Sequence, residues 1–221
     1  MAGPAPSSPS TIPPQPTALR VLVTGFGPFS TVKVNPSWLA VKPLHNTTLH
    51  TLDPAARPIH ITALEVPVTY TDVLFLTPRF HASPPVLPSP RDPAVAPYPP
   101  PADGFDFILH VGVAGPGPMR AEKRGRKVGY NTPDAEGRLC APVPTEDGDA
   151  VGPNAAPPSG AGQVRSMLYD WARSFAAYLD PPVRGFGKGY EAFQDELFTE
   201  VDSDALIGYL KETGFTVCPC L

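Results

Sequence analysis

Proline, more than any other residue type, limits how this chain can fold. The sequence holds 33 prolines among its 221 residues, and they are concentrated in particular segments. Because proline lacks a backbone N–H and fixes its φ angle, segments rich in proline cannot form the interior of a helix or sheet. The foldable part of the chain must therefore lie between these segments.

Two proline-rich stretches flank the first foldable region. Residues 1–19 contain six prolines and no charged side chain, so we expect a disordered tail there. Residues 82–103 contain nine prolines and almost no hydrophobic periodicity, and we expect a disordered insertion. A second low-pattern insertion is expected near residues 141–162. The remainder, residues 20–221, is then expected to form a single α/β domain.

Composition and charge argue against several function classes. The net charge is −4 with a pI near 5.7, and Lys and Arg form no long run, so we expect no nucleic-acid partner. No apolar stretch is long enough to span a membrane, and the N-terminus lacks the apolar core of a secretory signal. The three cysteines do not make a disulfide framework, which favours a reducing, cytoplasmic setting.

Hydrophobic periodicity predicts strands that alternate with helices, which is typical of an α/β sheet with helices on both faces. Strands are expected over residues 20–26, 59–68 and 105–115, and from residue 215. One helix is expected to begin at Pro36 with Asn35 as its N-cap. A second is expected over 70–80 with a break before Pro78, and a third over 164–179. A fourth is expected over 204–213, with Asp202 or Ser203 as N-cap and Gly214 after its end.

The loop after the first predicted strand is a candidate ligand site. Gly25 and Gly27 allow a sharp turn there and Pro28 stiffens it, and ligands of open α/β sheets bind beyond the carboxyl ends of the strands. Phe26 and Phe29 would then face a small, flat, partly apolar ligand. The alternative is that both rings pack in the hydrophobic core.

A dinucleotide-binding motif does not fit this loop. Ser30 stands where the third glycine of the fingerprint should be, and Pro28 blocks the first turn of the helix that should follow. We therefore expect no bound cofactor, and no metal ion.

A second loop, residues 111–130, follows the longest apolar run of the chain. Glu122 lies in this loop among basic side chains, namely Arg120, Lys123, Arg124 and Arg126. A carboxylate in such a setting is usually a surface ion pair of small energetic value. These residues alone therefore leave a catalytic role for Glu122 open.

Four sequence blocks, taken in order and spacing, resemble the pyroglutamyl peptidase I family. They are VLVTGFGPF with VNPSW, EVPVTY, HVGVAG, and AEKRGRKVGY, with a fainter match through GKGYEAFQDEL to DALIGYLKETG. Members of that family are cytosolic cysteine peptidases that remove an N-terminal pyroglutamate from peptides. The resemblance implies a three-layer α/β/α sandwich, a cytoplasmic location and N-terminal pyroglutamyl peptides as partners.

The same resemblance implies roles for individual residues. Glu122 matches the acidic member of the family's Cys-His-Glu triad. Phe26 and Phe29 match the aromatic residues that sandwich the lactam ring, and Asn35 matches an asparagine that lines the same pocket. Arg138 aligns with an arginine near the oxyanion site, but only across an insertion in NTPDAEGRL.

The cysteine and histidine of the family's triad have no counterpart. After Val217 the sequence reads CPCL, and its last histidine is His110. A thiolate nucleophile requires an adjacent base. We therefore expect a C-terminally truncated member of the family that is inactive as written, with Cys140, Cys218 and Cys220 as ordinary thiols and His110 as a structural imidazole.

Two other functions stay open from the sequence. A non-catalytic protein could keep the lactam pocket and bind pyroglutamyl peptides, and a small α/β enzyme on a similar sheet could handle nucleosides or phosphates. Thiol-sensitive turnover of a pyroglutamyl amide, binding of pyroglutamate without turnover, and affinity for a nucleoside or phosphate would distinguish the three.

Overall fold

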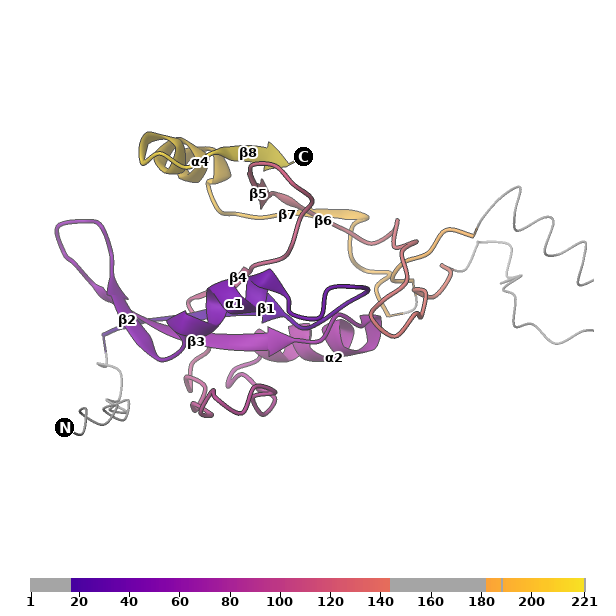
Figure 1. Ribbon diagram of the computed structural model, residues 1–221, viewed down its shortest axis with the longest axis horizontal. Coiled ribbons are helices and arrows are strands. Elements are labelled where there is room, and N and C mark those ends of the chain that lie inside the picture. The colour runs from indigo at the N-terminus through magenta and orange to yellow at the C-terminus, as the bar shows by residue number, and fades with distance from the viewer. Residues whose placement is uncertain (1–16, 144–181, 188, 221) are drawn as a thin grey trace, which may run out of the picture. The chain divides into compact units, whose positions relative to one another are not determined.

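The chain packs as two compact units, Met1–Val113 and Ala114–Leu221. A computed structural model describes residues 17–143, 182–187 and 189–220 (Figure 1). The tail up to residue 16, the predicted helix over 164–179 and most of the predicted insertion near 141–162 lie outside the described residues. Whether residues 20–221 form one domain stays a prediction.

The first unit is built on a four-stranded sheet of order β2-β3-β1-β4. The central strands β1 (Leu19–Phe26) and β3 (Pro58–Val66) are parallel neighbours. Strand β4 (Phe107–His110) lies parallel to β1 on its other side, and β2 (Thr47–His50) is an antiparallel edge strand beside β3. The parallel pairing places the carboxyl ends of β1, β3 and β4 at one edge of the sheet.

Helices α1 (Pro36–Val41) and α2 (Tyr70–Phe80) pack on opposite faces of this sheet. Side chains alternate along a strand, so Val23 faces the α1 side and Leu22 the α2 side. The α1 cluster consists of Val23, Trp38, Val41, Ile61, Ala63 and Val95. The α2 cluster consists of Leu22, Leu64, Val66, Leu76 and Phe80. The predicted α/β class is confirmed, whereas a three-layer sandwich over the whole chain stays a prediction.

The predicted break of the second helix before Pro78 is wrong. Helix α2 continues through Pro78 to Phe80. A proline so near the C-terminal end removes a single intrahelical hydrogen bond, to the carbonyl of Leu74. Phe80 beyond it is only 1% exposed, and burial of such a ring stabilises the last turn by about 1.5–3 kcal/mol.

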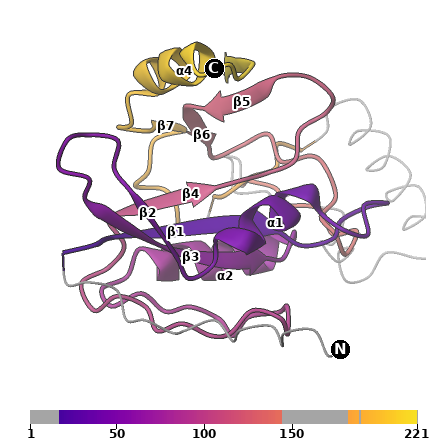
Figure 2. The ribbon, with the colours of Figure 1, turned by 60° about the vertical axis from the view of Figure 1, so that its left-hand side comes forward.

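Residues 82–103, the strap segment, contain no helix or strand, but the expectation that they are disordered is wrong (Figure 2). Val95 is 7% exposed within the α1 cluster, and Leu87 packs against the α2 cluster. The ring of Tyr98 lies 4.7 Å from that of His60. Prolines lose little conformational freedom when they are ordered, so a few anchoring side chains are enough to hold the segment.

Asp92 provides the polar anchor of the strap segment. Its Oδ2 accepts hydrogen bonds from Lys42 Nζ at 2.6 Å and from Trp38 Nε1 at 3.3 Å. The hydrogen bond from Lys42, followed by that from the Ala94 backbone, lowers the pKa of Asp92. This contact therefore joins the strap segment to α1 and to the 3₁₀ turn η1 (Lys42–Leu44) that follows it.

Strand β4 is shorter and less covered than its sequence predicts. An apolar run over residues 105–115 predicts a strand buried on both faces, but only Phe107–His110 forms one. Phe107 is 42% and Leu109 44% exposed, whereas Ile108 packs against the α2 cluster. Two-sided burial is therefore wrong for this strand. The first strand, in contrast, begins earlier than predicted, since Leu19 already pairs with Ile59.

The second unit contains two small sheets and a helix within its described residues. Strand β5 (Met119–Glu122) is parallel to β8 (Val217–Cys220), and β6 (Arg124–Arg126) is antiparallel to β7 (Glu196–Phe198). Only β8, which begins near the predicted residue 215, was expected as a strand.

Helix α4 (Ser203–Glu212) has the predicted caps. Asp202 Oδ1 accepts a hydrogen bond from Ala205 N at 2.9 Å. Gly214 follows the helix with φ +92°, and Phe215 N donates to Leu210 O at 2.9 Å, as is typical of a glycine C-terminal cap. No helix in the described part of the chain is both long and apolar enough to cross a membrane.

Gly25 is required by the close approach of β1 and α1. A Cβ at Gly25 would lie 2.7 Å from Trp38 Cα and 2.9 Å from Ser37 O. We predict that Gly25→Ala lowers the free energy of unfolding by about 1–3 kcal/mol, because backbone atoms must move to admit the methyl group. Urea denaturation measures this change. Gly112→Ala in the same unit, where no atom lies within 4 Å of the added Cβ, is the control and should be nearly neutral.

The Asp92–Lys42 contact predicts a pH-dependent part of the stability. Because the pKa of Asp92 is lowered by folding, the contact stabilises the fold above the unfolded-state pKa of about 3.9. This contribution is lost as the pH falls through the lower folded-state value. Urea midpoints from pH 6 to pH 3 should show Asp92→Asn less stable than the unaltered chain at pH 6, with the difference closing at the acid end. In a Lys42→Gln background most of the difference should vanish; a difference of unchanged size would contradict this origin.

Candidate functional site

The loop after β1 is held in one conformation by backbone hydrogen bonds. Gly27 N donates to Val66 O at 2.9 Å, which continues the pairing of β1 with β3 past the last residue of β1. Phe29 and Val32 then exchange two hydrogen bonds of 3.2 and 2.8 Å. The segment from Phe26 to Phe29 is therefore a defined turn at the carboxyl edge of the sheet, where the sequence predicts a ligand.

Asn35 joins this loop to α1. Its Oδ1 accepts hydrogen bonds from Ser37 N at 3.0 Å and Ser37 Oγ at 2.8 Å, and its Nδ2 donates to Gly27 O at 2.9 Å. Ser37 Oγ in turn accepts from Phe26 N at 3.0 Å. The predicted N-cap is confirmed. With the side chain 3% exposed and engaged in these bonds, the further role of lining a ligand pocket stays a prediction.

The two phenylalanines of the loop have different surroundings. Phe26 is half-buried and packs against the α2 cluster, so the alternative of core packing holds for part of this ring. Phe29 is also half-buried but belongs to neither core cluster of the described first unit. Of the two, Phe29 is thus the side chain with the less evident structural role. Their contact with a ligand stays a prediction.

Glu65 is a half-buried carboxylate at the same edge that the sequence reasoning missed. It precedes the last residue of β3 and is in register with Gly25. Its Oε1 lies 3.4 Å from the position that a Cβ would take at Gly27. Burial raises the pKa of Glu65; among nearby charges, Arg91 and Lys42 oppose this shift and Asp92 adds to it. The sequence signal that could have identified Glu65 is an acidic residue one position before the end of a largely buried strand.

His110 at the end of β4 is bound to the neighbouring strand. Its Nδ1 lies 2.7 Å from Thr24 Oγ1, and Thr24 is fully buried. Desolvation lowers the pKa of His110, and electrostatic repulsion from His81 lowers it further. Both effects favour a neutral imidazole at pH 7. This contact accords with the structural role expected of His110.

Glu122 lies in the second unit, at the end of β5. Its residue is exposed, and its Cα is in register with that of Cys220 on β8. Two of the neighbouring basic residues pair with other acids: Lys123 Nζ lies 2.5 Å from Asp204 Oδ1 and Arg124 Nη1 2.8 Å from Glu196 Oε1. The surface ion pairs expected in this loop are therefore present, but Glu122 is not the acid in either of these two. Its catalytic role stays a prediction.

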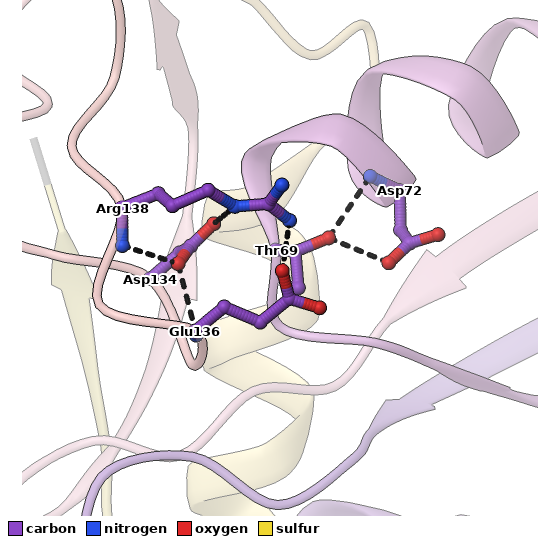
Figure 3. Close-up of polar contacts among 5 residues, drawn as sticks. All are labelled: Thr69, Asp72, Asp134, Glu136 and Arg138. Atoms are coloured by element: carbon purple, nitrogen blue, oxygen red, sulfur yellow. Dashed lines mark hydrogen bonds and ion pairs between the residues drawn. The ribbon is translucent and has the colours of Figure 1, made fainter.

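Arg138 is engaged by the acidic residues of its own loop (Figure 3). Its guanidinium forms an ion pair with Glu136, and its Nε lies 3.8 Å from Asp134 Oδ2. Asp134 Oδ1 also accepts hydrogen bonds from the backbone N–H groups of Glu136 and Arg138, each at 2.9 Å. These contacts give Arg138 a local structural role.

Thr69 begins helix α2 just beyond the carboxyl end of β3, and Figure 3 shows its contacts. Its Oγ1 accepts from Asp72 N at 3.0 Å and donates to Asp72 Oδ2 at 2.6 Å. As N-cap, Thr69 satisfies one free N–H of the first turn of α2. The two bonds also hold the connection from β3, which carries Glu65, to α2.

Cys140 has the properties of an inert thiol. It is 4% exposed, and its Sγ lies 3.6 Å from Gly185 O. Burial raises the pKa of Cys140, which disfavours the thiolate that a nucleophile requires. Within the described ranges, no group of three or more His, Cys, Asp or Glu side chains could hold a metal ion.

We predict that Asn35→Ala lowers the free energy of unfolding by about 2–3 kcal/mol, because it removes the N-cap and leaves the buried Gly27 carbonyl without its partner. Asn35→Ser keeps a side-chain oxygen as the N-cap acceptor but loses the donor to Gly27, so its loss should be smaller than that of Asn35→Ala. Urea denaturation of both variants checks the order. Equal stability of Asn35→Ala and the unaltered chain would show that the loop does not depend on this side chain.

The chain has a recognisable family segment. Residues 19–76 match the family model described as pyroglutamyl peptidase. This segment contains the loop after β1, Asn35 and Glu65, whereas Glu122 lies outside it. No curated protein sequence matches the chain significantly.

A search of solved structures matches pyroglutamyl and pyrrolidone carboxyl peptidases. A mutant pyrrolidone carboxyl peptidase from Pyrococcus furiosus shares 16% identity over 91% of this chain and 64% of its own, with a TM-score of 0.50. Pyroglutamyl peptidase I from Bacillus amyloliquefaciens shares 19% over 91% and 65%, with a TM-score of 0.49. Pyrrolidone carboxyl peptidase from Fervidobacterium islandicum shares 21% over 91% and 64%, with a TM-score of 0.47.

At such identities the likeness concerns the fold alone, and the Pyrococcus structure supports the α/β class. The chain spans about 65% of the length of these enzymes. The sequence similarity is confined to the matched segment, which spans β1, α1, β2, β3 and the first part of α2. Residues 19–76 are thus similar in sequence to the pyroglutamyl peptidase family.

Proposed function

We propose that this chain is of the pyroglutamyl peptidase I kind, a cysteine-type omega-peptidase that removes N-terminal pyroglutamate, and that its first unit carries the site for the pyroglutamyl ring. The observation that supports this most is the coincidence of two features in one segment. The family match covers residues 19–76, and the same residues build the fixed loop from Phe26 to Phe29 at the carboxyl edge of the sheet. This edge is where α/β sheets bind ligands.

The chemistry of the ligand suits this loop. A pyroglutamyl ring is small, nearly flat and amphiphilic, so it needs apolar surfaces for its faces and a few polar groups for its edge. Phe26 and Phe29 would supply the apolar surfaces. Asn35, through its bonds to Gly27 and Ser37, would hold the loop in the binding conformation before the ligand arrives, which lowers the entropic cost of binding.

Hydrolysis requires a thiolate and a base. In an enzyme of this kind the thiolate attacks the pyroglutamyl carbonyl, backbone amides stabilise the oxyanion, and an imidazolium protonates the leaving amine. Glu122 would orient that imidazole. All five histidines of this sequence lie at or before His110, and Cys140 is buried against a carbonyl. We therefore propose that the 221-residue chain binds pyroglutamyl peptides without hydrolysing them.

The second candidate function is a protein that binds pyroglutamyl peptides as its biological role. The state of Cys140 supports it, since a buried thiol with a raised pKa is a poor nucleophile. It shares the ligand site of the first candidate and differs from it in that binding, and not hydrolysis, is the biological role. A nucleoside- or phosphate-handling enzyme has no comparable support, because the donors and acceptors that fix the loop are used within the protein.

Titration calorimetry with L-pyroglutamyl amide, together with turnover of a fluorogenic pyroglutamyl amide, tests the proposal. We expect binding without turnover. Phe29→Ala should weaken binding about tenfold through loss of a ring face, with little change in stability because Phe29 is outside the core clusters. Phe75→Ala, which removes a ring that is 54% exposed on α2, is the matched control and should bind as the unaltered chain does.

Three outcomes would contradict parts of this proposal. Absence of binding to the unaltered chain would overturn the ligand assignment. Equal loss in Phe29→Ala and Phe75→Ala would remove Phe29 from the site. Turnover that an alkylating agent abolishes would overturn the absence of hydrolysis and require one of the three cysteines as nucleophile.

A further inference from the structure

Glu65 lies beside the loop that follows β1. Gly27 stands between Phe26 and Phe29 in sequence, and Glu65 Oε1 lies 3.4 Å from the place where a side chain at residue 27 would begin. The carboxylate is thus next to the turn that carries both rings.

The carboxylate of Glu65 has no hydrogen bond or ion pair with any described residue. The nearest ammonium group is already used, because Lys42 Nζ lies 2.6 Å from Asp92 Oδ2. Arg91 influences Glu65 electrostatically but forms no ion pair with it. A half-buried carboxylate loses part of its hydration, and nothing in the described protein replaces it.

This state is unfavourable for a residue with a purely structural role. Burial raises the pKa of Glu65, which is the sign of a charge that lacks compensation. The neighbouring Asp92, by contrast, accepts bonds from Lys42 and Trp38. Perturbed and unpartnered carboxylates at a ligand edge are candidates for a direct role in binding.

We propose that Glu65 is a specificity-determining residue that accepts the ring N–H of a pyroglutamyl group held at the Phe26–Phe29 loop. This inference rests on the proposed function. A lactam ring presents one donor, its N–H, and an ionised carboxylate is an acceptor only. Such a site accepts the lactam and repels a ring of the same shape that carries an oxygen lone pair in place of the N–H. Discrimination therefore comes from the unpaired acceptor as well as from the bond that it forms.

A matched ligand pair tests this role. L-pyroglutamyl amide and the corresponding lactone amide, in which oxygen replaces the ring N–H, differ only at the atom that Glu65 would contact. By titration calorimetry on the full chain we expect the lactam to bind at least about tenfold more tightly than the lactone, as for a hydrogen bond to a charged group. In Glu65→Leu the ratio should fall to about one, chiefly through loss of lactam affinity.

Two further variants separate this role from a structural one. Glu65→Gln keeps an uncharged acceptor, so its lactam-to-lactone ratio should lie between those of the unaltered chain and Glu65→Leu. Asp103→Asn removes an exposed carboxylate of the same unit and should leave the ratio unchanged. Thermal unfolding and circular dichroism establish that each variant is folded, and the ratio itself does not change if a variant merely reduces the folded fraction.

The outcomes distinguish this inference from the proposed function. If the unaltered chain binds the lactam but the ratio is the same in Glu65→Leu, the role of Glu65 is overturned and the ligand assignment stands. If the unaltered chain binds the lactam and the lactone equally, Glu65 does not accept a hydrogen bond from the ring N–H. If the unaltered chain binds neither ring, the proposed function and this inference fall together.

Discussion

The side chain of Asn35 connects β1, the loop after it and α1 through buried hydrogen bonds. One amide caps α1, binds the carbonyl of Gly27 and positions Ser37, whose hydroxyl accepts the N–H of Phe26. These bonds are buried, so each is costly to leave unmade. The direction in which the chain leaves β1 thus depends on a polar residue that sits nine positions after the strand ends. The absence of a side chain at Gly25 lets α1 come close enough for this to happen.

Many individual elements could be predicted from the sequence because their local signals agree. The apolar runs of β1 and β3, the Asn35–Pro36 start of α1 and the caps of α4 each have a clear chemical signature. The loop after β1 was identified by the same means, from glycines and a proline at a strand end. These features are encoded within a few residues of the chain and need no knowledge of distant contacts.

Other features depend on contacts that no local pattern contains. In the sequence, Glu65 is a single acidic residue in a predicted strand. Its place beside Gly27 cannot be predicted locally, because the two residues are 38 positions apart in the chain. The exposure of Phe107 and Leu109 is a property of what covers β4 and not of its composition. The strap segment has no periodicity, yet Val95 and Asp92 find partners on α1 and η1. The catalytic assignment of Glu122 rests on resemblance alone, and two of its basic neighbours, Lys123 and Arg124, pair with other acids.

The strap segment also decides which residues must be counted as part of the folded first unit. A boundary drawn by composition would treat residues 82–103 as dispensable. Their deletion would take one aliphatic side chain out of the α1 cluster, leave the indole N–H of Trp38 without its acceptor, and uncover the ring of His60. The strap segment therefore covers part of the hydrophobic core of the first unit. A shortened protein without it would expose that part of the core to solvent.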